Sequence, residues 1–396
     1  MRNTLLSVLF VWACPVWAEA PDTPSVTTEN KNKTLLEWVM KEKAPQLSSH
    51  MNLEFCTSAG AYFTDGSLDE ADFKLNRVRW EVKGEFGKGF SYHFRQSFNK
   101  YSNPHALDKL SSSVEYAFVK WDMRKRFALT AGKQILLLGG YEYWVNSMKV
   151  REFSDFNNNI NCYQAGVTAQ VTITPIQQLN FQVLNNRNGS DEDTYLYGLP
   201  DGVKKAKVPL IATANWDGYF FGSALNLRYS FSYGQLAEKR PVYYLTAGNV
   251  WKRGPVLAYV DFMYSREGLD SKGLVSELPA FPEGRNGVTA QHTEYFTTIA
   301  NLDYRVHPNW NVYVKGAYET GGVFKANGMY EEGLYRKTWN VQTCAEFYPM
   351  KNSELQIYLH LLYKKNSLTE RARLLGASGK STQRVSLGLV YTIPVF

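Results

Sequence analysis

Apolar and polar residues alternate with a period of two from residue 50 to the end of the chain. Val78, Trp80 and Val82, for example, alternate with Arg79 and Glu81. Successive side chains of a β-strand point to opposite faces, so this pattern predicts strands with one apolar and one polar face. Sixteen such strands are predicted, near residues 53–63, 77–86, 90–98, 114–121, 127–136, 163–173, 179–184, 208–216, 225–233, 242–250, 256–264, 296–306, 310–318, 339–347, 355–363 and 385–393.

The connections between these strands alternate between short and long, with one exception, a short connection at 234–240. This alternation is typical of an outer-membrane β-barrel, whose periplasmic turns are short and whose outer loops are long. The short connections are predicted at 87–89, 122–126, 174–178, 217–219, 252–254, 307–309 and 348–354, and the long ones at 64–72, 99–112, 139–160, 188–207, 266–292, 321–336 and 366–382.

Tryptophans gather beside the short connections. Trp121, Trp216, Trp251 and Trp310 each stand within one residue of a predicted short turn. Indole rings favour the headgroup boundary of a membrane, so tryptophans at one end of a barrel form a ring at a single membrane height. A soluble β-sheet has no comparable reason to place four tryptophans beside turns of one class. The pattern therefore favours a membrane barrel over a soluble sheet.

The predicted fold class is all-β, an antiparallel transmembrane β-barrel of about 16 strands over residues 51–396. After the first twenty residues no stretch reaches about 18 uncharged apolar residues, which excludes a helical membrane protein. In lipid every backbone polar group must be paired, so the sheet has to close. A closed barrel of this size leaves a lumen too wide for side chains to fill, and an open lumen indicates a channel.

Residues 1–20 have the organisation of a secretory signal peptide. Arg2 precedes an apolar run from Leu5 to Trp17, and small residues follow, so cleavage is expected after Ala20. The run is shorter than the about 18 residues that a membrane anchor needs. Processing at Cys14 as a lipoprotein is a minor alternative. The signal indicates export, and with the barrel it predicts a location in an outer membrane.

Residues 21–50 are polar and rich in Pro, Ser, Thr and Asn. This composition predicts a periplasmic spacer before the barrel. Thr34 and Glu37 have the spacing of a capping box, which predicts a short helix that ends before Pro45.

Charge and cysteine content narrow the function further. The 396 residues carry a net charge of +7, which on so long a chain does not indicate nucleic-acid binding. Three widely separated cysteines remain after signal cleavage, namely Cys56, Cys162 and Cys344. An odd and scattered set predicts packed thiols rather than a disulfide framework or a metal site. We expect neither a metal nor a cofactor.

Several segments resemble a known family. The run from Arg77 to Phe86, the segment from Phe127 to Gln134 and the Asn-rich loop after it resemble the phosphate-selective porin O and P family, and the similarity covers nearly all the chain after residue 50. The resemblance implies a sixteen-stranded porin in the outer membrane of a Gram-negative cell, usually a homotrimer. It also implies that the connection at 139–160 folds inward to narrow the pore, and that basic residues guide anions.

Basic residues outnumber acidic ones on the polar faces of the predicted strands. A water-filled passage between walls of low dielectric constant focuses such an excess, so small anions should be modestly favoured, with phosphate as one candidate. The basic residues are Arg77, Arg79, Lys83, Arg95, Lys120, Arg228, Arg305, Lys315, Lys364 and Arg384, and the acidic ones are Glu54, Glu81, Glu85, Asp261, Asp303, Glu319 and Glu346.

The densest basic patch comprises Arg77, Arg79 and Lys83 on one strand and Arg95 on the next. If the turn between these strands is symmetric, Glu81 lies opposite Arg95. Two interpretations stay open. The patch is either a track that steers anions or a wall of cross-strand ion pairs, each worth up to about 1 kcal/mol.

The connection predicted to fold inward contributes little positive charge, because Lys149 and Arg151 are outnumbered by Glu142, Glu152 and Asp155. The candidate residues that line the pore and steer anions are Arg77, Arg79, Lys83, Arg95, Lys149, Arg151 and Lys315.

A membrane hydrolase and a surface-binding or adhesin barrel are the alternative functions. No recognisable motif ties a histidine to the Ser, Asp or Glu of a catalytic site, and the long connections at 188–207 and 266–292 fit an adhesin as well as a porin. The sequence therefore predicts a porin, not an enzyme, that admits small hydrophilic solutes by passive diffusion and contacts outer-membrane lipid. The candidate bases considered are His93, His105, His292, His307 and His360.

Overall fold

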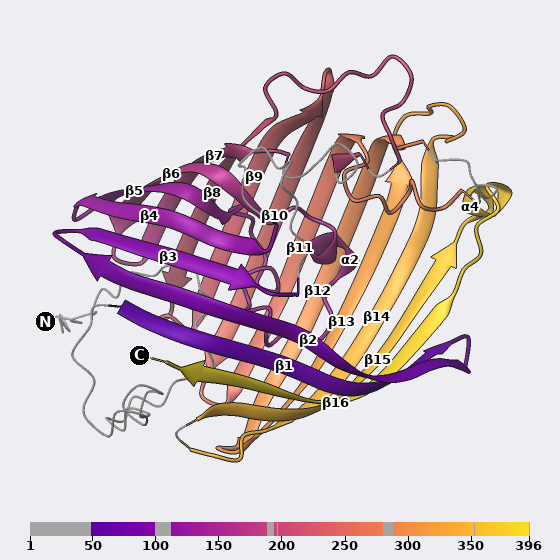
Figure 1. Ribbon diagram of the computed structural model, residues 1–396. Helices are drawn as coiled ribbons and strands as arrows, with labels where there is room; N and C mark the ends of the chain where they lie inside the picture. The colour runs from indigo at the N-terminus through magenta and orange to yellow at the C-terminus, as the bar shows by residue number, and fades with distance from the viewer. Residues whose placement is uncertain are drawn as a thin grey trace, which may run out of the picture.

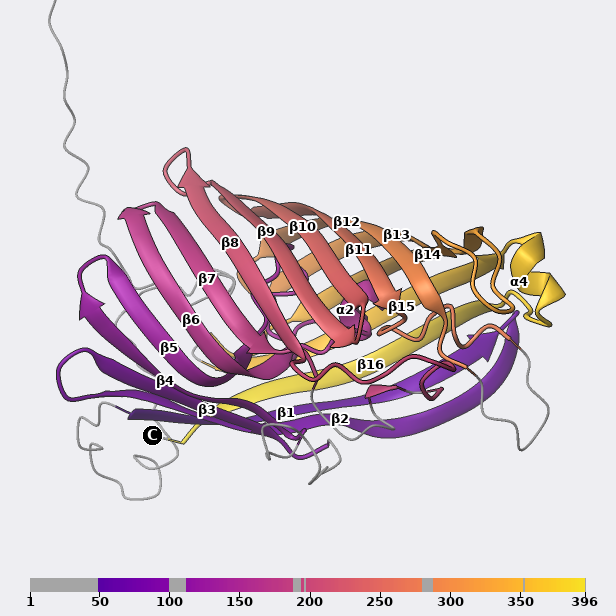
Figure 2. The same cartoon turned by 90° about the horizontal axis from the view of Figure 1, so that it is seen from above.

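Sixteen antiparallel strands close into a barrel in which β1 pairs with both β2 and β16 (Figures 1 and 2). This computed structural model describes residues 49–99, 112–187, 194–195, 197–279, 288–351 and 353–395. The predicted strand number and antiparallel closure are confirmed. The strands are β1 Ser49–Thr64, β2 Ser67–Phe86, β3 Phe90–Ser97, β4 Val114–Arg124, β5 Phe127–Ile135, β6 Tyr163–Thr174, β7 Gln177–Asn185, β8 Leu210–Phe220, β9 Leu225–Ala237, β10 Arg240–Arg253, β11 Val256–Leu269, β12 Gln291–His307, β13 Trp310–Val323, β14 Gly333–Phe347, β15 Glu354–Leu368 and β16 Ser381–Pro394.

The predicted signal peptide at 1–20 and the spacer up to residue 48 lie outside the described residues, as does His105. Met51 accepts a hydrogen bond from Val395 N–H beside the pairing of β1 with β16, so the ends of the described barrel meet at the closure.

The two faces of the sheet differ as the alternation predicts. On β9 the side chains of Arg228, Ser230 and Ser232 are buried toward the lumen, whereas Phe231 and Tyr233 are about half exposed on the outer surface. An exposed apolar exterior suits lipid, and the hydrogen-bonding groups of the interior suit water. The described chain contains no helix that is both long and apolar enough to cross a membrane.

The connections at one end of the barrel, here the turn end, are short, and most of those at the other, the loop end, are long. The short connection between β9 and β10 confirms the predicted exception. The prediction of a long connection at 64–72 is wrong. Asp65 and Gly66, both with positive φ, form a tight turn, and the polar residues from Ser67 onward continue β2 because they pair with β1.

The turn predicted at 217–219 also lies elsewhere. Asp217 and Gly218 resemble a turn signal, but β8 continues through them to Phe220, and the chain reverses between Phe220 and Leu225. Asp217 is held in the strand by Arg228 on β9, whose Nη2 lies 2.9 Å from the Asp217 carboxylate. A cross-strand ion pair thus outweighs the local turn preference.

An aromatic girdle surrounds the turn end. The ring of Phe90 stacks on Phe86 at 5.5 Å and on Trp121 at 5.4 Å, and Trp310 packs against Phe347 at 4.7 Å. The expected ring of aromatic side chains is therefore present. Trp216, Trp251 and Phe221 continue it around β8–β10, although the shifted turn leaves Trp216 further from the chain reversal than expected.

The interior of the barrel is partly filled. The short helix α2, Asp155–Asn158, lies inside the barrel, whereas α4, Glu370–Leu374, stands at the loop end (Figures 1 and 2). Around α2 an apolar core joins inward-facing residues of β7, β8 and β10–β14 to the connection between β5 and β6. This half of the lumen is packed like a protein interior.

The three cysteines are free thiols, as predicted. Cys56 and Cys344 are buried and Cys162 is half-buried. Cys56 and Cys344 belong to a small apolar cluster with Met148 and Tyr358, so they act as packed side chains.

Candidate functional site

The connection between β5 and β6, residues 136–162, crosses the lumen and is called the inward loop here. Gly139 N–H donates to Ser230 Oγ on β9 at 2.8 Å and to Thr246 Oγ1 on β10 at 2.6 Å. Further along, Arg151 Nη2 donates to Gln356 Oε1 on β15 at 2.8 Å. The loop therefore spans from one wall to the opposite one, which confirms the inward folding that the family resemblance implies.

Glycines allow the loop to approach the wall closely. A Cβ atom added to Gly248 on β10 would lie 2.7 Å from the backbone N and Cα of Gly140. A Cβ atom at Gly139 would lie 2.6 Å from the carbonyl oxygens of Arg228 and Thr246. Both contacts are shorter than a real Cβ tolerates, so only glycine permits this packing.

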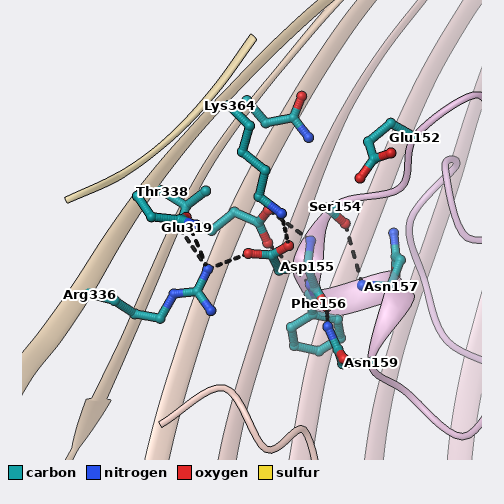
Figure 3. Close-up of polar contacts among 12 residues, drawn as sticks. Glu152, Ser154, Asp155, Phe156, Asn157, Asn159, Glu319, Arg336, Thr338 and Lys364 are labelled. Carbon is teal, nitrogen blue, oxygen red and sulfur yellow. Dashed lines mark hydrogen bonds and ion pairs between the residues drawn. The ribbon is translucent and has the colours of Figure 1, made fainter. Parts of the chain in front are cut away.

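Asp155 anchors α2 to the wall (Figure 3). Its carboxylate binds Arg336 on β14 and Lys364 on β15. Glu319 on β13 accepts the backbone N–H groups of Asp155, at 2.8 Å, and Phe156, at 3.1 Å. Ser154 caps the same helical turn. A carboxylate at the start of this turn satisfies amide groups that have no partner within the helix.

Glu142 is the second anchor of the inward loop. Lys315 Nζ on β13 lies 2.6 Å from Glu142 Oε1. The other oxygen accepts hydrogen bonds from Ser154 Oγ and Asn157 Nδ2, both at 2.7 Å. Burial raises the pKa of Glu142, but Lys315 and these hydrogen bonds lower it by more, so the carboxyl group titrates below its ordinary range. The anchor is therefore ionised at neutral pH.

A segment after β11, residues 270–278, also folds over the packed half of the lumen. Asp270 accepts the N–H groups of Gly273 at 3.0 Å and Ser276 at 2.9 Å. The ammonium group of Lys272 lies over the rings of Phe156, at 4.3 Å, and Tyr244, at 4.6 Å. This segment therefore rests on α2 and covers the loop end of the packed half.

The inward loop leaves cavities on both of its sides. Beside β2–β9 lie a turn-end cavity of about 610 Å³ and a loop-end cavity of about 370 Å³, and Tyr116, Ile135 and Trp144 line both. A minor turn-end cavity of about 100 Å³ lies beside β11–β15, and a minor loop-end cavity of about 200 Å³ lies beside β15, β16, β1 and β2. The larger pair shares three lining residues, so these two cavities are neighbours along the barrel.

Two of the predicted pore-lining residues are buried in ion pairs. Arg79 is fully buried and binds Glu54 through its Nε, and its Nη2 donates to Asn146 Oδ1 of the inward loop at 2.8 Å. Arg95 Nε donates to Glu115 at 2.8 Å. The pairing of β2 with β3 also places Glu81 opposite Arg95, as the symmetric turn predicts. For these two arginines the ion-pair interpretation agrees with the geometry.

Two further predicted residues hold the inward loop. Lys315 binds Glu142, as described, and Arg151 lies 3.6 Å from Glu346 and 3.7 Å from the ring centre of Tyr358. Both side chains are almost fully buried. They position the loop, and they also line the two minor cavities described above.

The remaining three predicted residues also line cavities, as Arg95, Arg151 and Lys315 do. Arg77 lines both the loop-end and the minor loop-end cavity, and it also contacts Ser147 of the inward loop. Lys83 lines the turn-end cavity with 41% of its side chain exposed. Lys149 lines the minor turn-end cavity. Their role in steering anions stays a prediction.

Sequence reasoning missed Lys133 and Glu115, which line the loop-end cavity together with Arg95. The pairing of β3 with β4 shifts register between Arg95 and Gln96. Gly132, beside Lys133, has a positive φ of 125°. Such irregularities break the inward and outward alternation, so the period-two pattern alone carried no signal for these two residues.

The described histidines have identifiable neighbours. His93 lines the turn-end cavity and its Nε2 lies 2.7 Å from Glu81 Oε1. His360 lines the minor loop-end cavity and its Nε2 lies 3.2 Å from Gln342 Oε1. Both therefore face the lumen, as the alternation predicts. Among the described residues, no group of three or more His, Cys, Asp and Glu side chains is placed to hold a metal ion.

Solved structures with a similar fold are outer-membrane proteins. The outer membrane channel DcaP of Acinetobacter baumannii is 13% identical with a TM-score of 0.59, covering 88% of this chain and 99% of that one. The anion-selective porin from Comamonas acidovorans is 10% identical with a TM-score of 0.57, covering 87% and 99%. OmpT of Vibrio cholerae is 10% identical with a TM-score of 0.52, covering 89% and 100%. At these identities the likeness concerns the fold.

A family comparison adds to the fold. No curated protein matches the chain significantly. The sequence profile of the family described as "Phosphate-selective porin O and P" matches residues 51–393, which is nearly the whole barrel. The chain therefore belongs to the phosphate-selective porin O and P family and is an outer-membrane porin.

Proposed function

We propose that this porin admits small hydrophilic solutes by passive diffusion and modestly favours anions over cations. Solutes pass through the hydrated cavities beside β2–β9, and the inward loop limits their size. Fixed charges on the walls raise the local concentration of ions of opposite sign.

The observation that carries this proposal is the charge of the two cavities toward the loop end. The loop-end cavity is lined by Arg77, Arg95 and Lys133 against one acid, Glu115. In the minor loop-end cavity the basic residues are Arg77, Arg151 and Arg384, and the acid is Glu152. Anions that enter from this end therefore meet a positive potential first.

The cavities toward the turn end carry balanced charge, which keeps the preference modest. Lys83 and Arg228 face Glu85 and Asp217 in the turn-end cavity. The minor turn-end cavity is lined by Lys149 and Lys315 against Asp303 and Glu346.

Phosphate stays one candidate among several anions. A site selective for phosphate needs several cationic donors that converge on one position. Arg79, Arg95 and Arg151 instead lie against carboxylates of the protein. We therefore propose a general anion preference.

The reversal potential of single channels in a KCl gradient tests the preference. Arg77→Ala removes a positive charge that lines both loop-end cavities, and it should shift the reversal potential toward cation preference. The matched control is Lys325→Ala, since Lys325 is exposed beyond β13 and lines none of these cavities. Equal reversal potentials for Arg77→Ala and the unaltered porin would refute the role of Arg77.

We also propose that the barrel has no hydrolase activity. The lumenal histidines His93 and His360 are engaged by Glu81 and Gln342. A nucleophile beside a histidine base, which acyl transfer needs, is not among these contacts. Turnover of lipid or peptide by purified porin, abolished by His93→Ala, would support the hydrolase alternative instead.

Export, domain limits and assembly complete the proposal. We propose cleavage of the signal peptide after Ala20, a periplasmic spacer from residue 21 to the start of β1 at Ser49, and a homotrimer of barrels. N-terminal sequencing of the porin from outer membranes should begin at Pro21. Chemical cross-linking in those membranes should yield trimers, and a ladder that stops at the monomer would contradict them.

A further inference from the structure

The turn-end cavity has two chemically different walls. One is built from aromatic rings of β3 and β4, and the other from amide and hydroxyl groups of β5–β8. Its volume of about 610 Å³ lies within the range of about 300–1,000 Å³ that is usual for small-molecule sites.

The aromatic wall is a continuous cluster of rings. The ring of His93 lies 4.6 Å from that of Tyr116 and 5.5 Å from that of Phe118, and Tyr116 and Phe118 are 5.7 Å apart. Trp144 of the inward loop also lines the cavity, and its indole N–H donates to the carbonyl oxygen of Leu138 at 2.7 Å. The wall therefore offers fixed apolar faces to a ligand.

The opposite wall carries uncharged hydrogen-bonding groups. Asn180 Nδ2 donates to Asn215 Oδ1 at 3.0 Å, and Gln178 Nε2 donates to Asn180 Oδ1 at 2.8 Å. Thr168 Oγ1 donates to Gln134 Oε1 at 2.6 Å. These contacts fix the orientation of the side chains, while each amide keeps further donor and acceptor capacity.

The charged groups of this cavity compensate one another. Arg228 forms two hydrogen bonds, at 2.9 and 3.1 Å, to one oxygen of Asp217, and its guanidinium group lies 4.6 Å from the ring centre of Trp144. Lys83 lies 3.9 Å from Glu81. A cavity with balanced charge gives no preference to an ionic ligand, so its specificity must come from ring stacking and hydrogen bonding.

We propose that the turn-end cavity is a binding site for a neutral sugar, a monosaccharide or disaccharide, on its way through the pore. A pyranose ring presents an apolar face of C–H groups and an equatorial rim of hydroxyl groups. The ring face would stack on Phe118, and the hydroxyl groups would exchange hydrogen bonds with Gln178, Asn180 and Asn215. This inference rests on the proposed function as a diffusion channel and adds a solute class to it.

Block of the ion current by maltose tests the site. Maltose should reduce single-channel conductance of the porin in a saturable manner, because a bound sugar obstructs the proposed path through the cavities beside β2–β9. Sorbitol, which has hydroxyl groups but no ring face, should reduce it much less. Phe118→Ala should weaken the apparent affinity for maltose roughly tenfold, since it removes one stacking face. The matched control Phe90→Ala, in the girdle outside the lumen, should leave the affinity unchanged.

Equilibrium dialysis of labelled maltose against detergent-solubilised porin gives a second readout that does not need conduction. Binding that is retained without channel activity would reject the proposed function but keep the sugar site. A conducting channel that binds no maltose, or that binds it equally well after Phe118→Ala, would overturn the sugar site and leave the porin function standing.

Discussion

Lys315 Nζ on β13 lies 2.6 Å from Glu142 Oε1 and 2.6 Å from the backbone carbonyl oxygen of Glu152. One lysine of the barrel wall thus joins two separate points of the inward loop. Both partners of the ion pair are almost fully buried, so removal of either leaves a charge without compensation.

Replacement of Lys315 by methionine should loosen the inward loop. The substitution leaves the buried Glu142 carboxylate without its cation, which typically costs about 3–5 kcal/mol. The loop should then leave the wall for part of the time, so single-channel conductance should rise and fluctuate more. Planar-bilayer recordings measure both quantities.

The matched control for this variant is Lys337→Met. Lys337 is exposed on β14, so its loss should change neither conductance nor noise. If Lys315→Met channels conduct like the unaltered porin while the loop keeps its resistance to proteases, the ion pair is not what holds the loop.

The same anchors predict how the loop responds to acid. Burial raises the pKa of Asp155, but Arg336 and Lys364 lower it by more, and Glu142 behaves in the same way with Lys315. A carboxylate whose pKa is lowered by folding contributes stability above its unfolded pKa, about 4, and this contribution is lost as the pH falls through the folded pKa. The hold of these two anchors on the loop should therefore be constant from about pH 7 to about pH 5, and its loss should raise the conductance only below about pH 4.

Conductance recorded over a pH series shows at which pH the loop is released. Lys315→Met lacks the strongest attraction on Glu142, so its rise should occur at a higher pH. An increase in the unaltered porin already between about pH 7 and pH 5 would show that other groups control the loop.

The barrel was predictable because its causes are local. Alternation of Val78, Trp80 and Val82 with charged residues is enforced by lipid on one face and water on the other. A symmetric turn is enough to place Glu81 opposite Arg95, and the structure has this register. The same reasoning failed at Ser67, since a polar run pairs as a strand only if its partner strand extends equally far.

The site was less predictable because its contacts join distant parts of the chain. Sequence alone shows Arg151 in a loop and Glu346 in a strand, and no periodicity indicates that they lie 3.6 Å apart. The charge count treated Glu142 and Glu152 of the inward loop as acids that reduce the positive charge of the pore. In the structure they bind Lys315 and Arg384 of the barrel wall instead. Charge counting therefore overestimated the basic groups open to solutes.

Arg77 and Arg79 should respond differently to substitution although they share a strand. Arg79→Met removes a buried arginine that is paired with Glu54 and lines none of the four cavities, so the charge that a passing solute meets changes little. Stability should fall by about 3–5 kcal/mol, seen as a lower unfolding temperature in detergent, whereas the reversal potential should stay nearly constant. Arg77→Ala should instead shift the reversal potential toward cation preference and leave the unfolding temperature nearly unchanged. Equal reversal-potential shifts for both variants would contradict the distinction between buried and cavity-lining arginines.

Close packing of the inward loop against β10 gives a steric prediction. In Gly248→Ala the new methyl group would lie 2.7 Å from the backbone of Gly140, and backbone on both sides cannot rotate away as a side chain would. The loop should therefore be displaced, with higher conductance and faster proteolysis within residues 136–162. Gly316→Ala on β13 is the control, since its added Cβ meets only the carbonyl oxygen of Asn340 at 3.9 Å. Neither substitution alters charge, so both variants should keep the ion selectivity of the unaltered porin. A shift of the reversal potential in Gly248→Ala alone would mean that the docked loop itself contributes to selectivity.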